Sequence, residues 1–236
     1  MSLFSSWLAL RRARLRRGRI GLIVLDADGV LIDYHEGYAM AWERAFGERP
    51  KVRDPHAYHP VDYWDVPCLT GSELQHLRRF GFTSELWRSM PAIAGAQEAC
   101  QMLREAGCQL ACVTALDARF EQERRANLEN LGFGLRAVYA VGNAGLGNPK
   151  ARHVVALAPK AFVDDFLPYL QRLPASIWRA LIIGRPNLNP NMRETLVQPD
   201  SRHETLLEFA RFWTRPQEIS GMYYAGKATR TPTGPG

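Results

Sequence analysis

Residues 22–30 read LIVLDADGV, and this stretch decides the fold. A short apolar run that ends at a turn signal is typical of a buried strand in a parallel sheet. Asp26 and Asp28 follow the run directly, so they stand at the carboxyl end of the strand, where open α/β sheets bind ligands. Two buried carboxylates are costly unless something offsets their charge, and a divalent cation does so. The stretch therefore predicts metal-assisted chemistry on an anionic substrate.

Further apolar runs along the chain predict strands, and helical segments separate them. The expected strands after the first cover residues 109–114, 137–141, 161–163 and 180–183, and the expected helices lie at 93–107, 117–131 and 150–158. Strands that alternate with helices imply right-handed crossovers and a parallel, three-layer α/β sheet. Thr114 ends the second strand, and Asp164 with Asp165 ends the fourth. Because parallel strands share one carboxyl edge, we expect these side chains to lie close to Asp26.

Taken in chain order, these motifs resemble the signatures of the haloacid dehalogenase-like (HAD) superfamily. They are the Asp26-x-Asp28-Gly pattern, an apolar strand ending in Thr114, a lysine, and an apolar strand ending in Asp164-Asp165. One such motif is weak, but several in order on predicted strand ends are specific. The resemblance covers residues 21–183 apart from an insertion. It implies a Rossmann-like core with a small, mostly helical cap inserted after the first strand.

The predicted organisation has four parts. Residues 1–19 form a basic leader, 20–33 and 91–214 the HAD core, 34–90 the cap, and 215–236 a disordered tail. The leader holds six arginines and no acidic residue, and the chain's net charge is also +6. The rest of the chain is therefore balanced and gives no reason to expect nucleic-acid binding. The leader itself suits a basic amphipathic helix, which could make weak contact with a membrane surface or a partner, although we favour a frayed helix packed loosely on the body.

The resemblance implies a mechanism for the first aspartate pair. Asp26 is the expected nucleophile, which attacks phosphorus to give an aspartyl-phosphate. Asp28 is the expected general acid for the leaving oxygen and then the base for the hydrolytic water. Mg²⁺ is the expected cofactor, held by Asp26 and by the backbone carbonyl of Asp28 together with Asp164 and Asp165. The cation screens the repulsion between a carboxylate and an anionic phosphate.

Two further side chains complete the expected catalytic set. Thr114 donates a hydrogen bond to a phosphoryl oxygen, and a lysine supplies positive charge to the same group. Lys150 and Lys160 both precede the fourth strand. Lys160 adjoins its amino end, and a five-residue strand spans about 16 Å. We therefore favour Lys150.

These residues predict a Mg²⁺-dependent phosphatase that acts on a small phosphorylated metabolite. Asp28 argues against a haloacid dehalogenase, which lacks a carboxylate at that position. A phosphomutase shares the same residues and remains an alternative, as does a non-catalytic HAD-fold binding protein anchored by its basic N-terminus. Aromatic residues of the cap could stack on a base or sugar, although we favour a role in the cap's own core. Substrate identity and oligomeric state stay open.

The compartment is predicted from the cysteines and from hydropathy. The four cysteines show no zinc-like pairing, which favours a reducing, cytoplasmic setting. No apolar run approaches the roughly 20 residues of a membrane-spanning helix.

Overall fold

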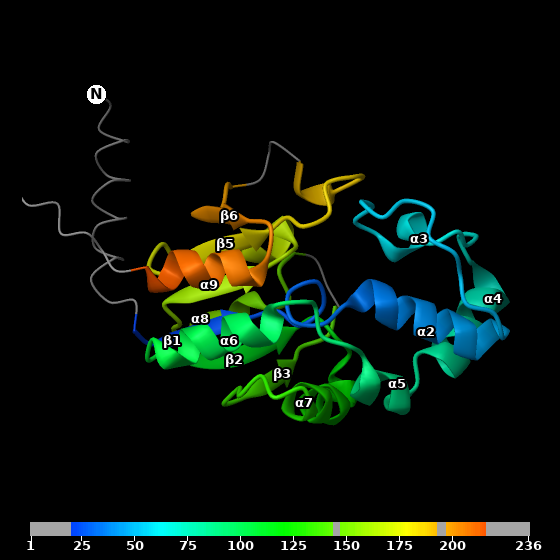
Figure 1. The fold of residues 1–236 in the computed structure, drawn as a ribbon, viewed down its shortest axis with the longest axis horizontal. Coiled ribbons are helices and arrows are strands. Elements are labelled where there is room, and N and C mark those ends of the chain that lie inside the picture. Colours follow the sequence, from blue (N-terminus) through cyan, green and yellow to red (C-terminus); the bar gives the residue numbers. More distant parts are fainter. Residues whose placement is uncertain (1–19, 144–146, 193–196, 216–236) are drawn as a thin grey trace, which may run out of the picture.

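The computed structural model describes residues 20–143, 147–192 and 197–215, and these form a six-stranded, all-parallel sheet (Figure 1). The strand order is β3-β2-β1-β4-β5-β6. The strands are β1 (Leu22–Leu25), β2 (Gln109–Thr114), β3 (Val138–Ala140), β4 (Ala161–Asp164), β5 (Trp178–Ile182) and β6 (Ser201–His203). The chain builds outward from β1 in both directions, so the carboxyl end of β1 lies at the topological switch point. The predicted leader and, apart from residue 215, the predicted disordered tail lie outside the described residues.

Both faces of the central strand are buried, as a parallel sheet requires. Ile23 and Leu25 face one apolar cluster and Val24 the other, with no exposed surface on any of them. On the first face lie α6 (Ala96–Glu105), α7 (Glu121–Asn130) and α9 (Leu206–Thr214), and on the second lies α8 (Ala151–Leu157). The layered α/β architecture predicted from the sequence is confirmed.

A group of helices lies beyond the carboxyl end of β1 (Figure 1). They are α2 (Tyr34–Phe46), α3 (Pro60–Tyr63), α4 (Gly71–His76), a π-helical turn (Leu77–Gly81) and α5 (Ser84–Ser89). The Asp33 side chain begins α2 by accepting hydrogen bonds from the backbone N–H groups of His35 and Glu36. At Gly81, a Cβ atom would approach the Ala41 carbonyl oxygen to 2.5 Å, so glycine permits the π-helical turn to pack on α2. These helices occupy the predicted mostly helical insertion.

The observed elements differ from the predicted ones at several places. The fifth strand, Trp178–Ile182, begins two residues earlier and ends one residue earlier than predicted, so it is one residue longer. The helix predicted at 117–131 begins with a 3₁₀ turn, Ala118–Phe120, before α7. The sequence reading missed β6, which lacks an apolar run, and α9. The signal for α9 was available, because its four buried residues, Leu206, Phe209, Ala210 and Trp213, follow helical spacing. Two short 3₁₀ turns, Leu167–Leu170 and Pro190–Met192, complete the described elements.

Candidate active site

Backbone hydrogen bonds hold the loop after β1 in a tight turn, with Asp26 at the carboxyl edge of the sheet. The Ala27 carbonyl accepts hydrogen bonds from the N–H groups of residues 30, 31 and 32, which closes a tight turn. Gly29 within that turn has φ +83°, and a Cβ atom there would meet Asp165 Oδ2 at 2.3 Å. Glycine is required at this position both for the backbone conformation and for the close approach. The turn therefore brings the Asp26 segment against the end of β4.

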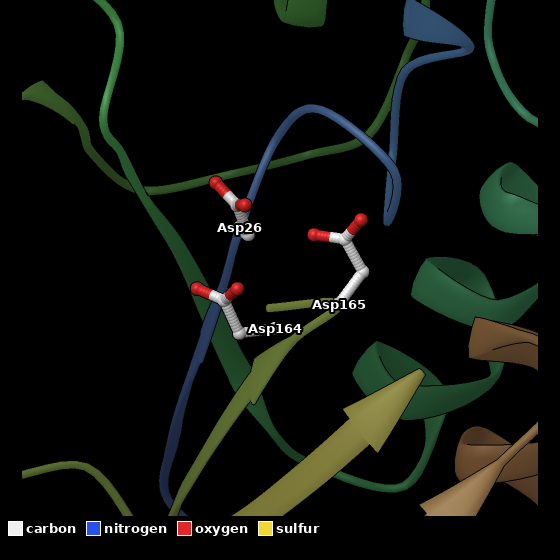
Figure 2. Close-up of side chains that lie close together, drawn as sticks. All are labelled: Asp26, Asp164 and Asp165. Atoms are coloured by element: carbon white, nitrogen blue, oxygen red, sulfur yellow. The ribbon is translucent and has the colours of Figure 1, made fainter. Parts of the chain in front are cut away.

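Three carboxylates converge at the ends of β1 and β4 (Figure 2). One oxygen each of Asp26, Asp164 and Asp165 lies within 4.8 Å of the others. Asp26 is 5% exposed and Asp164 is fully buried. Hard oxygen donors at such spacing suit a small divalent cation such as Mg²⁺. The donor set thus fits the metal that the sequence predicts, although the Asp28 side chain is not part of this cluster.

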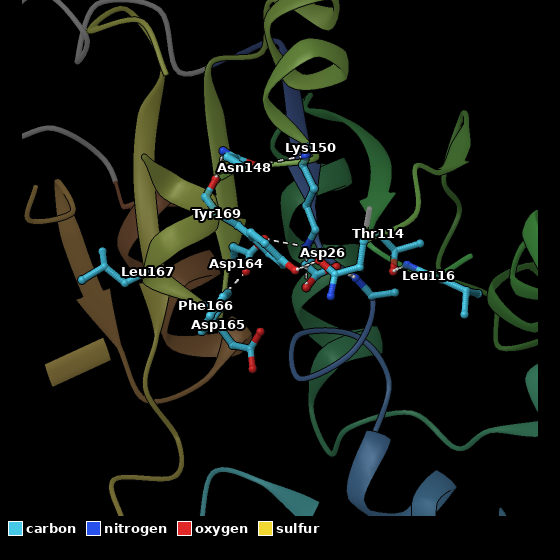
Figure 3. Close-up of polar contacts among 12 residues, drawn as sticks. Asp26, Thr114, Leu116, Asn148, Lys150, Asp164, Asp165, Phe166, Leu167 and Tyr169 are labelled. Atoms are coloured by element: carbon cyan, nitrogen blue, oxygen red, sulfur yellow. Dashed lines mark hydrogen bonds and ion pairs between the residues drawn. The ribbon is translucent and has the colours of Figure 1, made fainter. Parts of the chain in front are cut away.

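Lys150 supplies the positive charge at this cluster (Figure 3). Its side chain is fully buried, and Nζ lies 2.8 Å from Asp26 Oδ2 and 2.7 Å from Asp164 Oδ2. Burial alone lowers the pKa of Lys150, but the Asp164 and Asp26 carboxylates outweigh it and raise the pKa above its ordinary value. Lys160 is exposed and lies beside Gly21, at the amino end of β1. Of the two candidate lysines, the structure places only Lys150 near the carboxylates.

The crowded carboxylates disturb one another's ionisation. Burial raises the pKa of Asp164 to about 7, against the opposing charge of Lys150. Burial also raises the pKa of Asp165, and the neighbouring charges of Asp164 and Asp26 add to it. The single charge of Lys150 leaves the three carboxylates incompletely compensated, and a divalent cation would supply further positive charge.

We expect Mg²⁺ to stabilise the protein more strongly as the pH rises. The folded pKa of Asp164, about 7, lies above its ordinary 3.8. The stability from this group is therefore fully present below that ordinary value and lost as the pH rises through the folded value. Mg²⁺ binds the deprotonated carboxylates, so its stabilisation grows across the same window.

Thermal melts with Mg²⁺ and with EDTA, taken at steps from about pH 5 to about pH 8, test this expectation. Groups elsewhere titrate in the same way in both samples, so their effect on Tm is removed when the two Tm values are subtracted at each pH. A difference that shrinks with rising pH contradicts the assignment of the cluster as a cation site.

Thr114 ends β2 beside the cluster and is 1% exposed. Its Oγ1 accepts a hydrogen bond from Leu116 N at 3.3 Å, so the hydroxyl hydrogen remains available to donate. Tyr169 lies on the other side, with its ring centre 4.7 Å from Lys150 Nζ. Asn148 positions the start of α8, since its Oδ1 accepts from Lys150 N at 3.0 Å. Figure 3 shows Thr114 and Tyr169 on either side of the Asp26 carboxylate, with Asn148 at the backbone end of Lys150.

Asp28 points away from the carboxylate cluster and pairs with Arg124 of α7. Arg124 Nη2 lies 2.7 Å from Asp28 Oδ1, and the arginine side chain has no exposed surface. The guanidinium also lies 5.2 Å from the ring centre of Trp87 in α5. Burial raises the pKa of Asp28, and Arg124 opposes this rise. The pair holds the Asp28 carboxylate on the wall of the cavity, outside the group formed by Asp26, Asp164 and Asp165.

The sequence analysis missed Arg124, Tyr58 and Asn191. Arg124 stands in a run of charged residues, which reads as a solvated helix face. Tyr58 lies beside the Asp165 carboxylate, but it belongs to no recognisable sequence motif. Asn191 Nδ2 donates to the Asp165 carbonyl oxygen at 2.6 Å, and its Oδ1 accepts from Leu167 N. All three reach the site from distant parts of the chain, so no short sequence motif predicts their role there.

A cavity of about 670 Å³ opens above these side chains. Asp26, Asp28, Thr114 and Asp165 line one part of it, and aromatic residues of the helical insertion line another. Its size is within the range of small-molecule sites, about 300–1,000 Å³. The cluster is therefore reachable by a ligand larger than phosphate alone.

Solved structures of known proteins share this fold. The HAD hydrolase YfnB of Bacillus subtilis, bound to magnesium, has a TM-score of 0.55 and 15% identity, covering 83% of this chain and 99% of its own. A predicted phosphoglycolate phosphatase from Haemophilus somnus has a TM-score of 0.53 and 17% identity, covering 82% and 98%. The L-2-haloacid dehalogenase of Xanthobacter autotrophicus has a TM-score of 0.50 and 17% identity, also covering 82% and 98%.

The chain thus has the fold of the HAD superfamily of hydrolases, as the motifs indicated. No protein-family model matches the sequence, and no curated protein matches it significantly. Both phosphatases and dehalogenases occur among the similar structures, so the fold alone leaves the reaction open. Among the described residues, no helix has the length and apolar character of a membrane span.

Proposed function

We propose that this protein is a Mg²⁺-dependent phosphatase that hydrolyses a small phosphomonoester through an aspartyl-phosphate. The observation that carries the proposal is the position of the Asp26 carboxylate. It opens on the cavity, contacts Lys150, and lies within the cluster of Asp164 and Asp165. A carboxylate so placed is both a ligand for a cation and a nucleophile for a bound phosphoryl group.

The first chemical step forms the phosphoenzyme. An Asp26 oxygen attacks phosphorus while the bond to the alkoxide oxygen breaks, and that oxygen takes the proton of Asp28. Lys150 and the Thr114 hydroxyl stabilise the charge on the transferring group. Bound Mg²⁺ supplies charge that screens the repulsion between nucleophile and phosphate. Asp26, Asp164, Asp165 and the Asp28 carbonyl are the groups that would hold it.

The second step hydrolyses the aspartyl-phosphate and regenerates the free enzyme. Asp28, now ionised, takes a proton from water, and the water oxygen attacks the phosphorus of the aspartyl-phosphate. Asp26 leaves as carboxylate, phosphate is released, and Asp28 holds the proton again for the next cycle. Burial raises the pKa of Asp28 against the opposing charge of Arg124, and this direction supports the role of an acid.

The Asp28 carboxylate also supports a phosphatase over a dehalogenase. A departing halide needs no proton, whereas a departing alkoxide does. The ion pair with Arg124 holds Asp28 at the cavity, and an acid in that position serves an alkoxide leaving group. Cys68, Cys100 and Cys112 are free thiols, which supports the proposal of a reducing, cytoplasmic setting.

We expect Asp28→Asn to slow both chemical steps, by roughly 10²–10⁴-fold for the loss of one acid–base group. An amide neither protonates the leaving oxygen nor accepts a proton from water. Because hydrolysis of the intermediate also slows, a phosphoenzyme should accumulate on rapid quenching with a substrate that has a good leaving group. Intact-protein mass spectrometry measures it. An unchanged turnover rate removes Asp28 from the mechanism.

Phosphate release from a panel of phosphomonoesters, with Mg²⁺ and with EDTA, tests the proposal as a whole. The expected result is Mg²⁺-dependent release that ranks the esters. Halide release from 2-haloacids, measured in parallel without Mg²⁺, is the competing activity. Halide release without phosphate release would replace the proposed function with a dehalogenase.

A further inference from the structure

The catalytic cavity continues into a second cavity under the helical insertion. The second cavity measures about 380 Å³. The two share walls at Tyr34, Arg78, Trp87, Leu116 and Asp117. The space next to the phosphoryl position is therefore extended, and a substrate's leaving group is the part that would fill it.

Stacked aromatic rings form one wall of this extension. The rings of Tyr34 and Trp87 are 6.5 Å apart with 14° between their planes. Those of Phe82 and Trp87 are 5.4 Å apart with 27° between their planes. Tyr34 and Trp87 border both cavities, so they serve the cap's core and the ligand space together. An aromatic lining favours a flat, polarisable ligand, which can contact ring faces or edges, over a branched one.

Arg78 lines both cavities and brings positive charge to the extension, which Arg119 and Asp117 also line. It is the one arginine or lysine that lines the larger cavity in the part of the chain that the structure describes. It is exposed and forms no ion pair with a described residue, whereas Arg119 nearby lies 3.3 Å from Asp117. Arg78 belongs to the π-helical turn Leu77–Gly81. Such turns are rare and occur often at functional sites, because they redirect a side chain.

We propose that the substrate's leaving group is an aromatic ring bearing a second anionic group, with the ring against Tyr34 and Trp87 and the anion on Arg78. This inference rests on the proposed phosphatase function. Such a substrate places its phosphoryl group at Asp26, its planar body beside it, and its second negative charge at Arg78, on the wall that the two cavities share. An arginine beside an aromatic wall recognises a carboxylate or phosphate through a forked pair of hydrogen bonds.

Three esters of primary alcohols separate these requirements. They are cyclohexylmethyl phosphate, 4-methylbenzyl phosphate and 4-carboxybenzyl phosphate. We expect kcat/KM to rise about tenfold when the ring becomes aromatic, and about tenfold again when the methyl group becomes a carboxylate.

Arg78→Gln tests the charged end, and Arg79→Gln is its matched control. Arg79 is the next residue of the same π-helical turn, is equally exposed, and lies over Phe80 rather than in either cavity. Arg78→Gln should reduce the preference for the carboxylated ester over the methyl ester to near unity, and Arg79→Gln should retain it. Equal kcat/KM for the three esters overturns the proposal, as does a preference that survives in Arg78→Gln.

The matching phosphonates, which cannot be hydrolysed, separate this proposal from the proposed function. Their dissociation constants are measured by calorimetry with Mg²⁺ present. Phosphonates that bind in the expected order, with no ester hydrolysed, support the subsite and contradict the phosphatase. If the esters are hydrolysed but the phosphonates do not bind in the expected order of affinity, the phosphatase proposal stands and the proposed subsite is overturned. Absence of both binding and hydrolysis overturns both.

Discussion

Replacing Asp26 with Asn should lower phosphate release by at least about 10⁴-fold, the scale of losing a catalytic nucleophile. The amide matches the carboxylate in size, so the packing at the end of β1 is retained. It is a poor nucleophile and carries no charge for Mg²⁺ or for Lys150, which lies 2.8 Å from Asp26. No aspartyl-phosphate should form, and this is measured by phosphate release and by mass spectrometry of the quenched enzyme.

Asp65→Asn is the matched control for this change. Asp65 is exposed on the helical insertion and pairs with Arg53 at 2.9 Å. The same substitution there removes a surface ion pair, worth about 0–1 kcal/mol, and should leave turnover intact. If Asp26→Asn retains a tenth of the wild-type rate with a normal melting curve, Asp26 is not the nucleophile.

Replacing Lys150 with Met should destabilise the metal-free protein by about 3–5 kcal/mol, the scale of breaking a buried charge pair. Lys150 is fully buried between Asp26 and Asp164, so its removal leaves those carboxylates uncompensated. The pKa of Asp164, already raised to about 7 by burial, loses the charge that opposes the rise. The penalty should therefore be smaller near pH 5, where Asp164 is protonated, than near pH 8. Urea unfolding in EDTA at both pH values measures it.

Lys160→Met is the control because Lys160 is exposed at the opposite end of the sheet. It should change the unfolding free energy by less than about 0.5 kcal/mol. Equal effects of the two substitutions would contradict the ion-pair geometry. Mg²⁺ should recover part of the stability of Lys150→Met, because a cation restores positive charge at the same carboxylates.

The positions of the strands were largely predictable from the chain. Residues 22–25 and 110–113 are continuous apolar runs, and each lies in the strand expected of it. Polar residues directly after such runs had to meet at one edge, because all the strands are parallel. Asp26, Thr114 and Asp164 are each placed by the end of the strand to which they belong or which they follow, so their positions could be predicted locally. β6 was not predictable, since a three-residue edge strand without an apolar run leaves no pattern.

The sequence by itself determined the parallel sheet, the acidic pair at its central strand and the edge at which the polar residues gather. The sequence also favoured Lys150 as a cation of the site, whereas only the tertiary structure showed that Arg124 pairs with Asp28. Arg124 and Lys150 are charged side chains that any helix surface could carry, yet both have no exposed surface. Their burial depends on contacts between segments far apart in the chain, as with Arg124 and Asp28. Periodicity and motifs report neighbours along the chain, whereas the partner of a buried charge is set by how the layers pack.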